Sequence, residues 1–234
     1  MIVESIQKHG LFAIPIYKLK FPLHSELKQS FIDYMENEDG FRLTTTNTCK
    51  FTTANLHKTK VFQPFTEFVE DGLMRIMDDL GYIPNIKLTG LWGTKHEDNQ
   101  FHHRHTHHNS FLAGVYYLSG SENCSGTTFY NFHHYHTIIR PAEKPGKQGA
   151  TLALSSHTEP FSEGTLVVFP AWLGHDTARN NIERTKSNRY ILSFNAMPVG
   201  MTNTDLFDRY NYPDPSKMKL INKPEERSTY RKNS

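Results

Sequence analysis

The spacing of apolar residues changes near residue 85, and the two halves of the pattern predict different structures. In residues 22–35 an apolar side chain recurs at every fourth position, which predicts an amphipathic helix. Residues 62–80 carry a longer apolar stripe at helical spacing, and Gly81 follows where that helix is expected to end. Residues 12–21 alternate apolar and polar positions in part and predict an early strand.

Beyond residue 85 the pattern consists of short apolar or alternating segments separated by turn residues such as Ser119–Gly120 and Glu163–Gly164. Short segments of this kind, bounded by turn residues, are typical of β-strands. The polar stretch 47–59 is expected to be a loop. Strands are expected at residues 86–94, 109–118, 126–132, 151–154, 165–169 and 189–196.

Many short strands without intervening helices indicate a β-sandwich or a β-barrel. Helices come first and strands later, so the expected class is mainly β, or α+β in the loose sense, with the two N-terminal helices buttressing the outside of a sheet. We expect a single domain over residues 1–234. It would consist of a helical and strand part at 1–85, the β core at about 86–198, and a C-terminal tail at 199–234.

The composition is that of an ordinary globular protein. The chain has 234 residues, 37% hydrophobic and 21% charged, with a formal net charge of +2. This near-neutral balance gives no reason to expect nucleic-acid binding. The sequence has no apolar run long enough for a membrane span and no signal-peptide pattern at its start, and it contains only two cysteines. These features predict a location in the cytoplasm.

Histidine is the unusual component, with 14 residues in the chain. Nine of them lie between His96 and His136. Because histidine is the commonest metal-ligating side chain, such a cluster needs an explanation. For most of the nine, a polar and solvated loop region is explanation enough.

His105 and His107 are a candidate pair of metal ligands. In a strand, residues two apart project from the same face, so that two imidazoles can converge on one cation. By the same alternation, Ala113, Val115 and Tyr117 would share that face if no bulge intervenes. Small and apolar side chains of this kind suit the interior of a barrel.

Two later segments add candidate residues. A buried apolar run over residues 164–170 is followed by His175, which stands where it could close a metal site at the mouth of a barrel. In residues 187–195 a predicted strand places Arg189, Ser193 and Asn195 on one face. A buried arginine needs a carboxylate partner, and few acidic residues are near in sequence, so a ligand carboxylate is an attractive candidate.

The combination of these segments resembles the 2-oxoglutarate/Fe(II)-dependent oxygenase superfamily. It is most similar to an oxygenase group that is common in bacteria and tailed phages. The order of the motifs carries this resemblance, and each motif alone is weak. The corresponding residues are Trp92, the run His105-Thr-His107-His-Asn-Ser110, Ala113-Gly-Val-Tyr-Tyr117, Phe169-Pro-Ala-Trp-Leu-Gly-His175 and Arg189-Tyr-Ile-Leu-Ser-Phe-Asn195.

The resemblance implies a double-stranded β-helix, or jelly roll, that binds Fe(II) and uses 2-oxoglutarate and O2. It implies an oxidoreductase that hydroxylates a C–H bond while 2-oxoglutarate becomes succinate and carbon dioxide. His105 and His175 would be iron ligands, and Arg189 would pair with the distal carboxylate of 2-oxoglutarate. Tyr117, within a Tyr-Tyr-Leu segment similar to that of prolyl hydroxylases, would help to hold that carboxylate, with Ser193 and Asn195 as weaker candidates.

The third iron ligand stays open at this point. The superfamily pattern places an acidic residue two positions after the first histidine, where this sequence has His107. His107 is the preferred third ligand because its surroundings match the family. The alternatives are the pair His96 and Asp98 as the first two ligands, or water in place of His107.

Two rival functions remain possible on the sequence alone. One is a cupin-like metal enzyme, either a dioxygenase or an isomerase, that works without 2-oxoglutarate. The other is a non-catalytic binding module. The substrate is unknown, and a protein residue, with proline as one candidate, or a small molecule would fit; for a phage-encoded protein the location would be the host cytoplasm.

Overall fold

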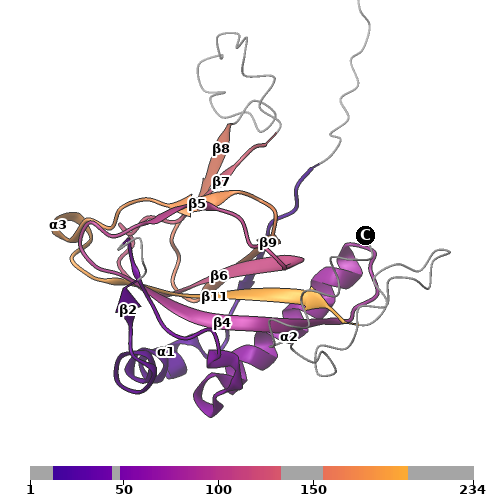
Figure 1. Cartoon of the computed structure of the whole chain (residues 1–234), viewed down its shortest axis with the longest axis horizontal. Helices are drawn as coiled ribbons and strands as arrows, with labels where there is room; N and C mark the ends of the chain where they lie inside the picture. The colour runs from indigo at the N-terminus through magenta and orange to yellow at the C-terminus, as the bar shows by residue number, and fades with distance from the viewer. Residues whose placement is uncertain (1–12, 44–47, 133–154, 200–234) are drawn as a thin grey trace, which may run out of the picture. The chain divides into compact units, whose positions relative to one another are not determined.

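The computed structural model describes residues 13–43, 48–132 and 155–199 of the chain (Figure 1). The chain divides into two units, and the first, residues 1–197, contains almost all of the described residues. No helix among the described residues is long and apolar enough to span a membrane.

A large antiparallel sheet forms the centre of this unit. Its strand order is β1-β9-β6-β11-β4-β3-β2, so that β11, the last strand, lies between β6 and β4. Strand β6 pairs with β9 on one side and with β11 on the other. The strands are β1 (Tyr17–Lys20), β2 (Arg42–Leu43), β3 (Lys50–Phe51), β4 (Ile86–His96), β6 (Leu112–Ser119), β9 (Thr165–Pro170) and β11 (Arg189–Pro198).

A smaller sheet, in the order β5-β10-β7-β8, faces the large one. Its strands are β5 (His102–His105), β7 (Thr127–Tyr130), β8 (Ser156–Glu159) and β10 (His175–Thr177). Phe129 from the small sheet meets Phe169 from the large sheet, with ring centroids 4.9 Å apart. The two sheets thus enclose one apolar interior, which is the jelly-roll core expected from the sequence.

Two helices cover the other face of the large sheet. Helix α1 (His24–Tyr34) continues into the π-helical turn η1 (Met35–Asp39), and α2 (Gln63–Asp79) follows two short 3-10 turns, η2 (Leu56–Lys58) and η3 (Lys60–Phe62). The apolar stripe of α2 packs into a second buried cluster with the outward-facing side chains of β6 and β11. Figure 1 shows α1 on the side of β4 away from β5, while α2 runs across β4 and β11 in this view. The predicted helices and their buttressing position are confirmed, including the end of α2 at Gly81, whose φ is +77°.

Alternation along β6 and β11 places the predicted residues in the interior. Ala113, Val115, Tyr117 and Ile191 belong to the cluster between the two sheets. Their neighbours Tyr116 and Phe194 belong to the cluster under the helices. The prediction that alternate residues of β6 and β11 face the interior between the sheets is therefore confirmed.

Several expectations for individual segments were wrong. The stretch 47–59 is not simply a loop, because β3 and η2 lie in it and Cys49 and Leu56 are fully buried. Strand β6 begins at Leu112 rather than at residue 109, because Asn109 has a φ of +54° that interrupts an extended strand. Strands β5, β8 and β10 were not predicted. The predicted strand at 151–154 and almost all of the predicted tail lie outside the described residues.

The short helix α3 (Ile182–Thr185) lies between β10 and β11 in the chain. Before it, the side chain of Asn180 is almost fully buried. Its amide nitrogen donates hydrogen bonds to the backbone oxygens of His96 (3.0 Å) and Ser187 (3.2 Å). One side chain thus holds the last residue of β4 next to the segment that enters β11.

Candidate metal centre

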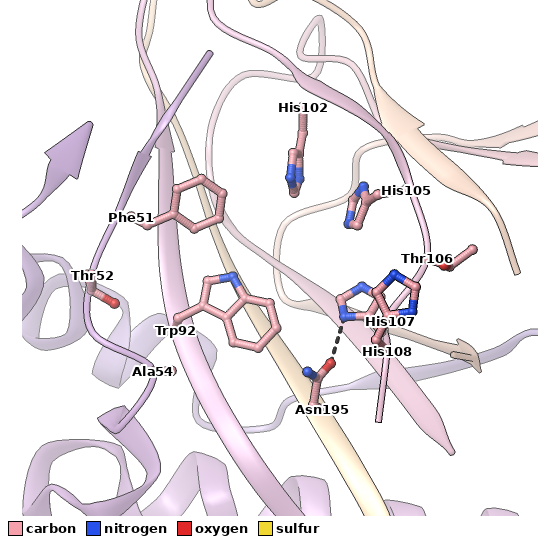
Figure 2. Close-up of a pocket in the computed structure, with 10 residues that line it drawn as sticks. All are labelled: Phe51, Thr52, Ala54, Trp92, His102, His105, Thr106, His107, His108 and Asn195. Atoms are coloured by element: carbon pink, nitrogen blue, oxygen red, sulfur yellow. Dashed lines mark hydrogen bonds between the residues drawn. The ribbon is translucent and has the colours of Figure 1, made fainter. Parts of the chain in front are cut away.

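A pocket of about 390 Å³ opens beside the strands that carry the histidines (Figure 2). Aromatic side chains of Phe51 and Trp92 form one wall, and imidazoles form the opposite one. A pocket that combines an apolar wall with a few polar groups suits a small organic ligand or a single side chain of a larger one. Its lining consists of Phe51, Thr52, Ala54, Trp92, His102, His105, Thr106, His107, His108 and Asn195.

The pairing of β5 with β10 brings two of the predicted ligands together. His105 lies directly opposite His175 in the antiparallel pair, and their ring centroids are 4.3 Å apart. The next paired residues are His102 and Thr177, so three steps along β5 match two steps along β10. This bulge in β5 turns His102 to the same side as His105, with ring centroids 4.0 Å apart.

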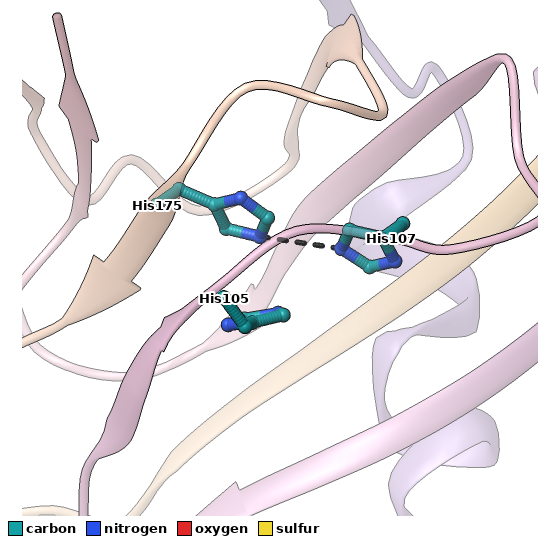
Figure 3. Close-up of side chains that lie close together, drawn as sticks. All are labelled: His105, His107 and His175. Carbon is teal, nitrogen blue, oxygen red and sulfur yellow. Dashed lines mark hydrogen bonds between the residues drawn. The ribbon is translucent and has the colours of Figure 1, made fainter. Parts of the chain in front are cut away.

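His107 reaches the same place from beyond the end of β5. Its backbone N–H donates a hydrogen bond of 2.9 Å to the carbonyl oxygen of Ala171, in the segment that leads to His175. Its ring lies parallel to that of His175, and the two Nε2 atoms are 3.2 Å apart (Figure 3). One ring nitrogen from each of His105, His107 and His175 lies within 4.8 Å of the other two.

Hydrogen bonds fix the orientation of all three rings through Nδ1. The acceptors are the backbone oxygen of His103 for His105 (2.8 Å), the backbone oxygen of Leu173 for His175 (2.9 Å) and Oδ1 of Asn195 for His107 (2.6 Å; Figure 2). Because a neutral imidazole carries only one N–H, a proton at Nδ1 leaves the lone pair on Nε2. Metal-binding histidines are held in this way by partners of the second nitrogen.

Burial keeps these imidazoles uncharged. It lowers the pKa of His175 to about 3 and that of His107 to about 4, and it also lowers the pKa of His105. The positive charge that His105 would carry further lowers the pKa of both His107 and His175. Uncharged imidazoles are the form that binds metals. Two nitrogens each about 2.1 Å from one cation and at right angles are about 3.0 Å apart, close to the observed 3.2 Å between His107 and His175.

Arg189, at the start of β11, is completely buried. Its Nη1 donates a hydrogen bond of 3.1 Å to Oγ of Ser125, while Nε and Nη2 have no hydrogen-bond partner. Among the described residues no carboxylate lies within ion-pair distance of this guanidinium, whose neighbours include Tyr117, Cys124 and Cys49. A buried arginine with two free donors fits a carboxylate supplied by a ligand.

The remaining predicted residues lie in the same interior. The Tyr117 hydroxyl donates to Oγ1 of Thr127 at 3.0 Å and accepts from the Thr127 backbone N–H at 3.2 Å. The charge of Arg189 lowers the pKa of Tyr117, although burial has the larger and opposite effect. Ser193 is buried on the face that also carries Arg189. Asn195 contacts His107, a role that the sequence alone did not indicate.

Of the alternatives for the first two ligands, the geometry does not bring His96 and Asp98 together with His175. His96 is fully buried at the end of β4, whereas Asp98 is exposed in the turn that follows. His103 and His108 are exposed, as expected for solvated histidines, and His133, His134 and His136 lie outside the described residues. The sequence reasoning missed His102, because only the bulge in β5 turns it towards the centre.

Residues 90–195 match the family model described as "Putative 2OG-Fe(II) oxygenase". By this match the segment resembles the 2OG-Fe(II) oxygenase family. The oxygenase segment contains all three histidines, Arg189 and the pocket wall at Trp92, and enzymes of this family depend on Fe(II) and 2-oxoglutarate. No curated protein matches the chain significantly in sequence.

Solved oxygenase structures share the fold. A prolyl-4-hydroxylase from Pseudomonas putida is 11% identical, with a TM-score of 0.56 and coverage of 80% of this chain and 95% of that one. The epimerase SnoN from nogalamycin biosynthesis is 11% identical, with a TM-score of 0.58 and coverage of 80% and 79%. HygX from Streptomyces hygroscopicus, solved with nickel, 2-oxoglutarate and hygromycin B, is 14% identical, with a TM-score of 0.52 and coverage of 79% and 83%. At these identities the likeness concerns the fold alone.

Proposed function

We propose that this oxygenase hydroxylates a C–H bond with Fe(II) bound by His105, His107 and His175. The observation that carries the proposal is the convergence of three uncharged imidazoles, each with Nδ1 engaged by an acceptor. This leaves a lone pair on each Nε2 for a cation. Imidazole nitrogens are suitable ligands for iron.

The donor set fits Fe(II) but differs from the usual two histidines and one carboxylate. With three neutral imidazoles, the charge of the cation is not reduced by any protein ligand. A dianionic co-substrate would supply the compensation. The charge balance therefore favours a centre that binds its metal more tightly once 2-oxoglutarate is present.

Arg189 is the residue proposed to hold the distal carboxylate of that co-substrate. An arginine buried without a counter-ion is costly, by roughly several kcal/mol. A carboxylate that accepts hydrogen bonds from Nε and Nη2 would remove this cost. The proposal assigns Tyr117 and Ser193 to the walls of the same recess.

The bound iron and 2-oxoglutarate would supply the oxidising power: 2-oxoglutarate and O2 give succinate and carbon dioxide, and one oxygen atom enters the substrate. The protein's own part is to orient and enclose. Asn195 fixes the His107 ring, and the wall of Phe51 and Trp92 excludes water from one side of the centre. The substrate we propose is a protein side chain or a small molecule whose C–H bond enters the pocket between this wall and the imidazoles.

Anaerobic binding and uncoupled turnover test the proposal together. Purified protein is titrated with ferrous iron under anaerobic conditions, and succinate formation from 2-oxoglutarate is then measured after O2 is admitted. We expect one iron per chain, with binding lost in His105→Ala and His175→Ala. The matched control is His103→Ala, which removes an exposed imidazole from the same strand but leaves the backbone oxygen that His105 uses. A wild-type protein that binds no ferrous iron would contradict the proposal.

A further inference from the structure

The metal centre leaves one buried histidine of this segment without a role. His96 is the last residue of β4 and is completely buried. Neither of its ring nitrogens has a hydrogen-bond partner. A buried imidazole with both nitrogens unpaired costs free energy, because its N–H and its lone pair are removed from water without compensation.

His96 and Arg189 lie at the same end of the large sheet. Strands β4 and β11 are hydrogen-bonded neighbours. The amide of Asn180 binds the His96 backbone oxygen and the backbone oxygen of Ser187, two residues before Arg189. The guanidinium is near enough for its charge to lower the pKa of His96, which burial already places well below its ordinary value. His96 is therefore uncharged and offers one N–H beside the cation.

These two side chains account for four of the six buried side-chain atoms that lack a partner in the described part of the chain: Nδ1 and Nε2 of His96, and Nε and Nη2 of Arg189. The other groups that interact electrostatically with the guanidinium are Tyr117, Cys49, Cys124 and His102, and none of them is a carboxylate. Donors from a neutral imidazole and a guanidinium can converge on one carboxylate, which has about four acceptor positions.

We infer that His96 is a second donor to the distal carboxylate of 2-oxoglutarate, next to Arg189. This inference rests on the proposed function and assigns a residue that the ligand motifs leave out. His96 acts as a specificity residue for a dicarboxylic 2-oxoacid: its contact exists only when the ligand carries an anionic group at the end remote from the metal. A residue that merely fills space would favour no particular 2-oxoacid.

The test compares two ligands that differ in the distal carboxylate. The protein is loaded with Ni²⁺, the metal present in the HygX structure, so that no oxidation occurs. The dissociation constants of 2-oxoglutarate and of 2-oxobutanoate, which lacks the distal carboxylate, are measured by calorimetry. For His96→Leu we expect 2-oxoglutarate to bind about 10- to 100-fold more weakly, as for a lost hydrogen bond to a charged group. Binding of 2-oxobutanoate should change by less than about 2-fold.

Two further variants separate a lost contact from a damaged fold. His96→Gln keeps an N–H donor and should recover part of the affinity for 2-oxoglutarate. His24→Leu is the matched control, because His24 is a partly buried histidine on α1, bonded to the Tyr116 hydroxyl under the opposite face of the large sheet. It should leave both dissociation constants unchanged even if it lowers the melting temperature.

The outcomes distinguish the two proposals. If wild-type protein binds Ni²⁺ but no 2-oxoglutarate, the proposed function fails and the role of His96 fails with it. If wild-type protein binds 2-oxoglutarate and His96→Leu binds it equally well, only the role of His96 is overturned. An equal loss of affinity for both 2-oxoacids would also overturn it. Removing a contact with the distal carboxylate cannot weaken the binding of a ligand that has no such carboxylate.

Discussion

Asn195→Ala should weaken metal binding without removing any proposed ligand. The Asn195 side chain accepts the Nδ1 hydrogen bond of His107 at 2.6 Å and lies on β11, beside the pocket. Without this acceptor, the ring of His107 is free to rotate or to move its proton to Nε2. Either change removes the lone pair that is aimed at the other two imidazoles.

The magnitude follows from two independent estimates. Removing a hydrogen-bonding partner of a metal-bound histidine typically costs about 10- to 100-fold in metal affinity, which is roughly 1.4 to 2.8 kcal/mol at about 1.4 kcal/mol per tenfold. Leaving a buried N–H without an acceptor costs about 1–3 kcal/mol. His107 is only half-buried, so water can partly replace the lost acceptor. We therefore expect the lower part of the range, about 10-fold.

The assay is a competitive titration of Ni²⁺ against a chelator of known affinity, under identical conditions for each variant. Asn195→Asp keeps an acceptor at the same position and adds negative charge near the cation. It should bind Ni²⁺ at least as tightly as the wild-type protein. Asn37→Ala, which removes an exposed amide on η1, provides the control for a surface change.

Two results would refute the reasoning. An Asn195→Ala variant with an affinity within about 2-fold of the wild-type value would show that the hydrogen bond does not orient a ligand. An Asn195→Asp variant as weak as Asn195→Ala would show that something other than the acceptor matters at this position. In either case Asn195 would lose its proposed role in orienting the His107 ring.

Three other predictions follow from the same structure. Without metal, the melting temperature should fall as the pH drops below about 6.5, the pKa of histidine in an unfolded chain: burial lowers the pKa of His175 to about 3 and that of His107 to about 4, so the unfolded state takes up protons first. His175→Gln should make the melting temperature depend less steeply on pH between pH 7 and 4, as measured by thermal unfolding. An unchanged slope would argue against a contribution of His175 to the pH dependence. Arg189→Leu should raise the melting temperature of the ligand-free protein, because it removes an unpaired buried charge, and should abolish the stabilisation by 2-oxoglutarate measured by calorimetry; a lower melting temperature with that stabilisation retained would contradict both expectations. Leu73→Ala, in the fully buried stripe of α2, should destabilise the protein by about 2–5 kcal/mol in urea unfolding, and a loss under about 1 kcal/mol would mean that α2 is not packed as described.

The sequence predicted the elements whose pattern is set by burial against a single core. The stripe of α2 and the alternation of β6 and β11 are of this kind, since each apolar residue there marks the side that faces away from water. Arg189 stood out for the same reason, because a charge on an apolar face requires a partner. The convergence of His105 and His175 followed from the order of the motifs rather than from any measurable pattern in the residues.

The strands that carry the centre could not be predicted in this way. Strand β5 reads His-His-Arg-His and β10 reads His-Asp-Thr, so neither contains an apolar residue that would reveal a buried face. Their inward-facing side chains include imidazoles that can bind a metal, in place of the apolar residues of a core. The burial of His96 and the contribution of Asn195 depend on pairings between strands that are distant in the sequence, and these are not visible in any local window.

The bulge in β5 constrains how the chain length around the centre can vary. Three steps along β5 match two along β10, and this mismatch lets His102 and His105 face the same side. In a regular strand only residues an even number of steps apart share a face, so the three steps from His102 to His105 suit the centre only while the bulge is kept. A change of length between these two residues must therefore alter the bulge with it, and a transplant of this centre into another jelly roll must carry the irregular strand intact.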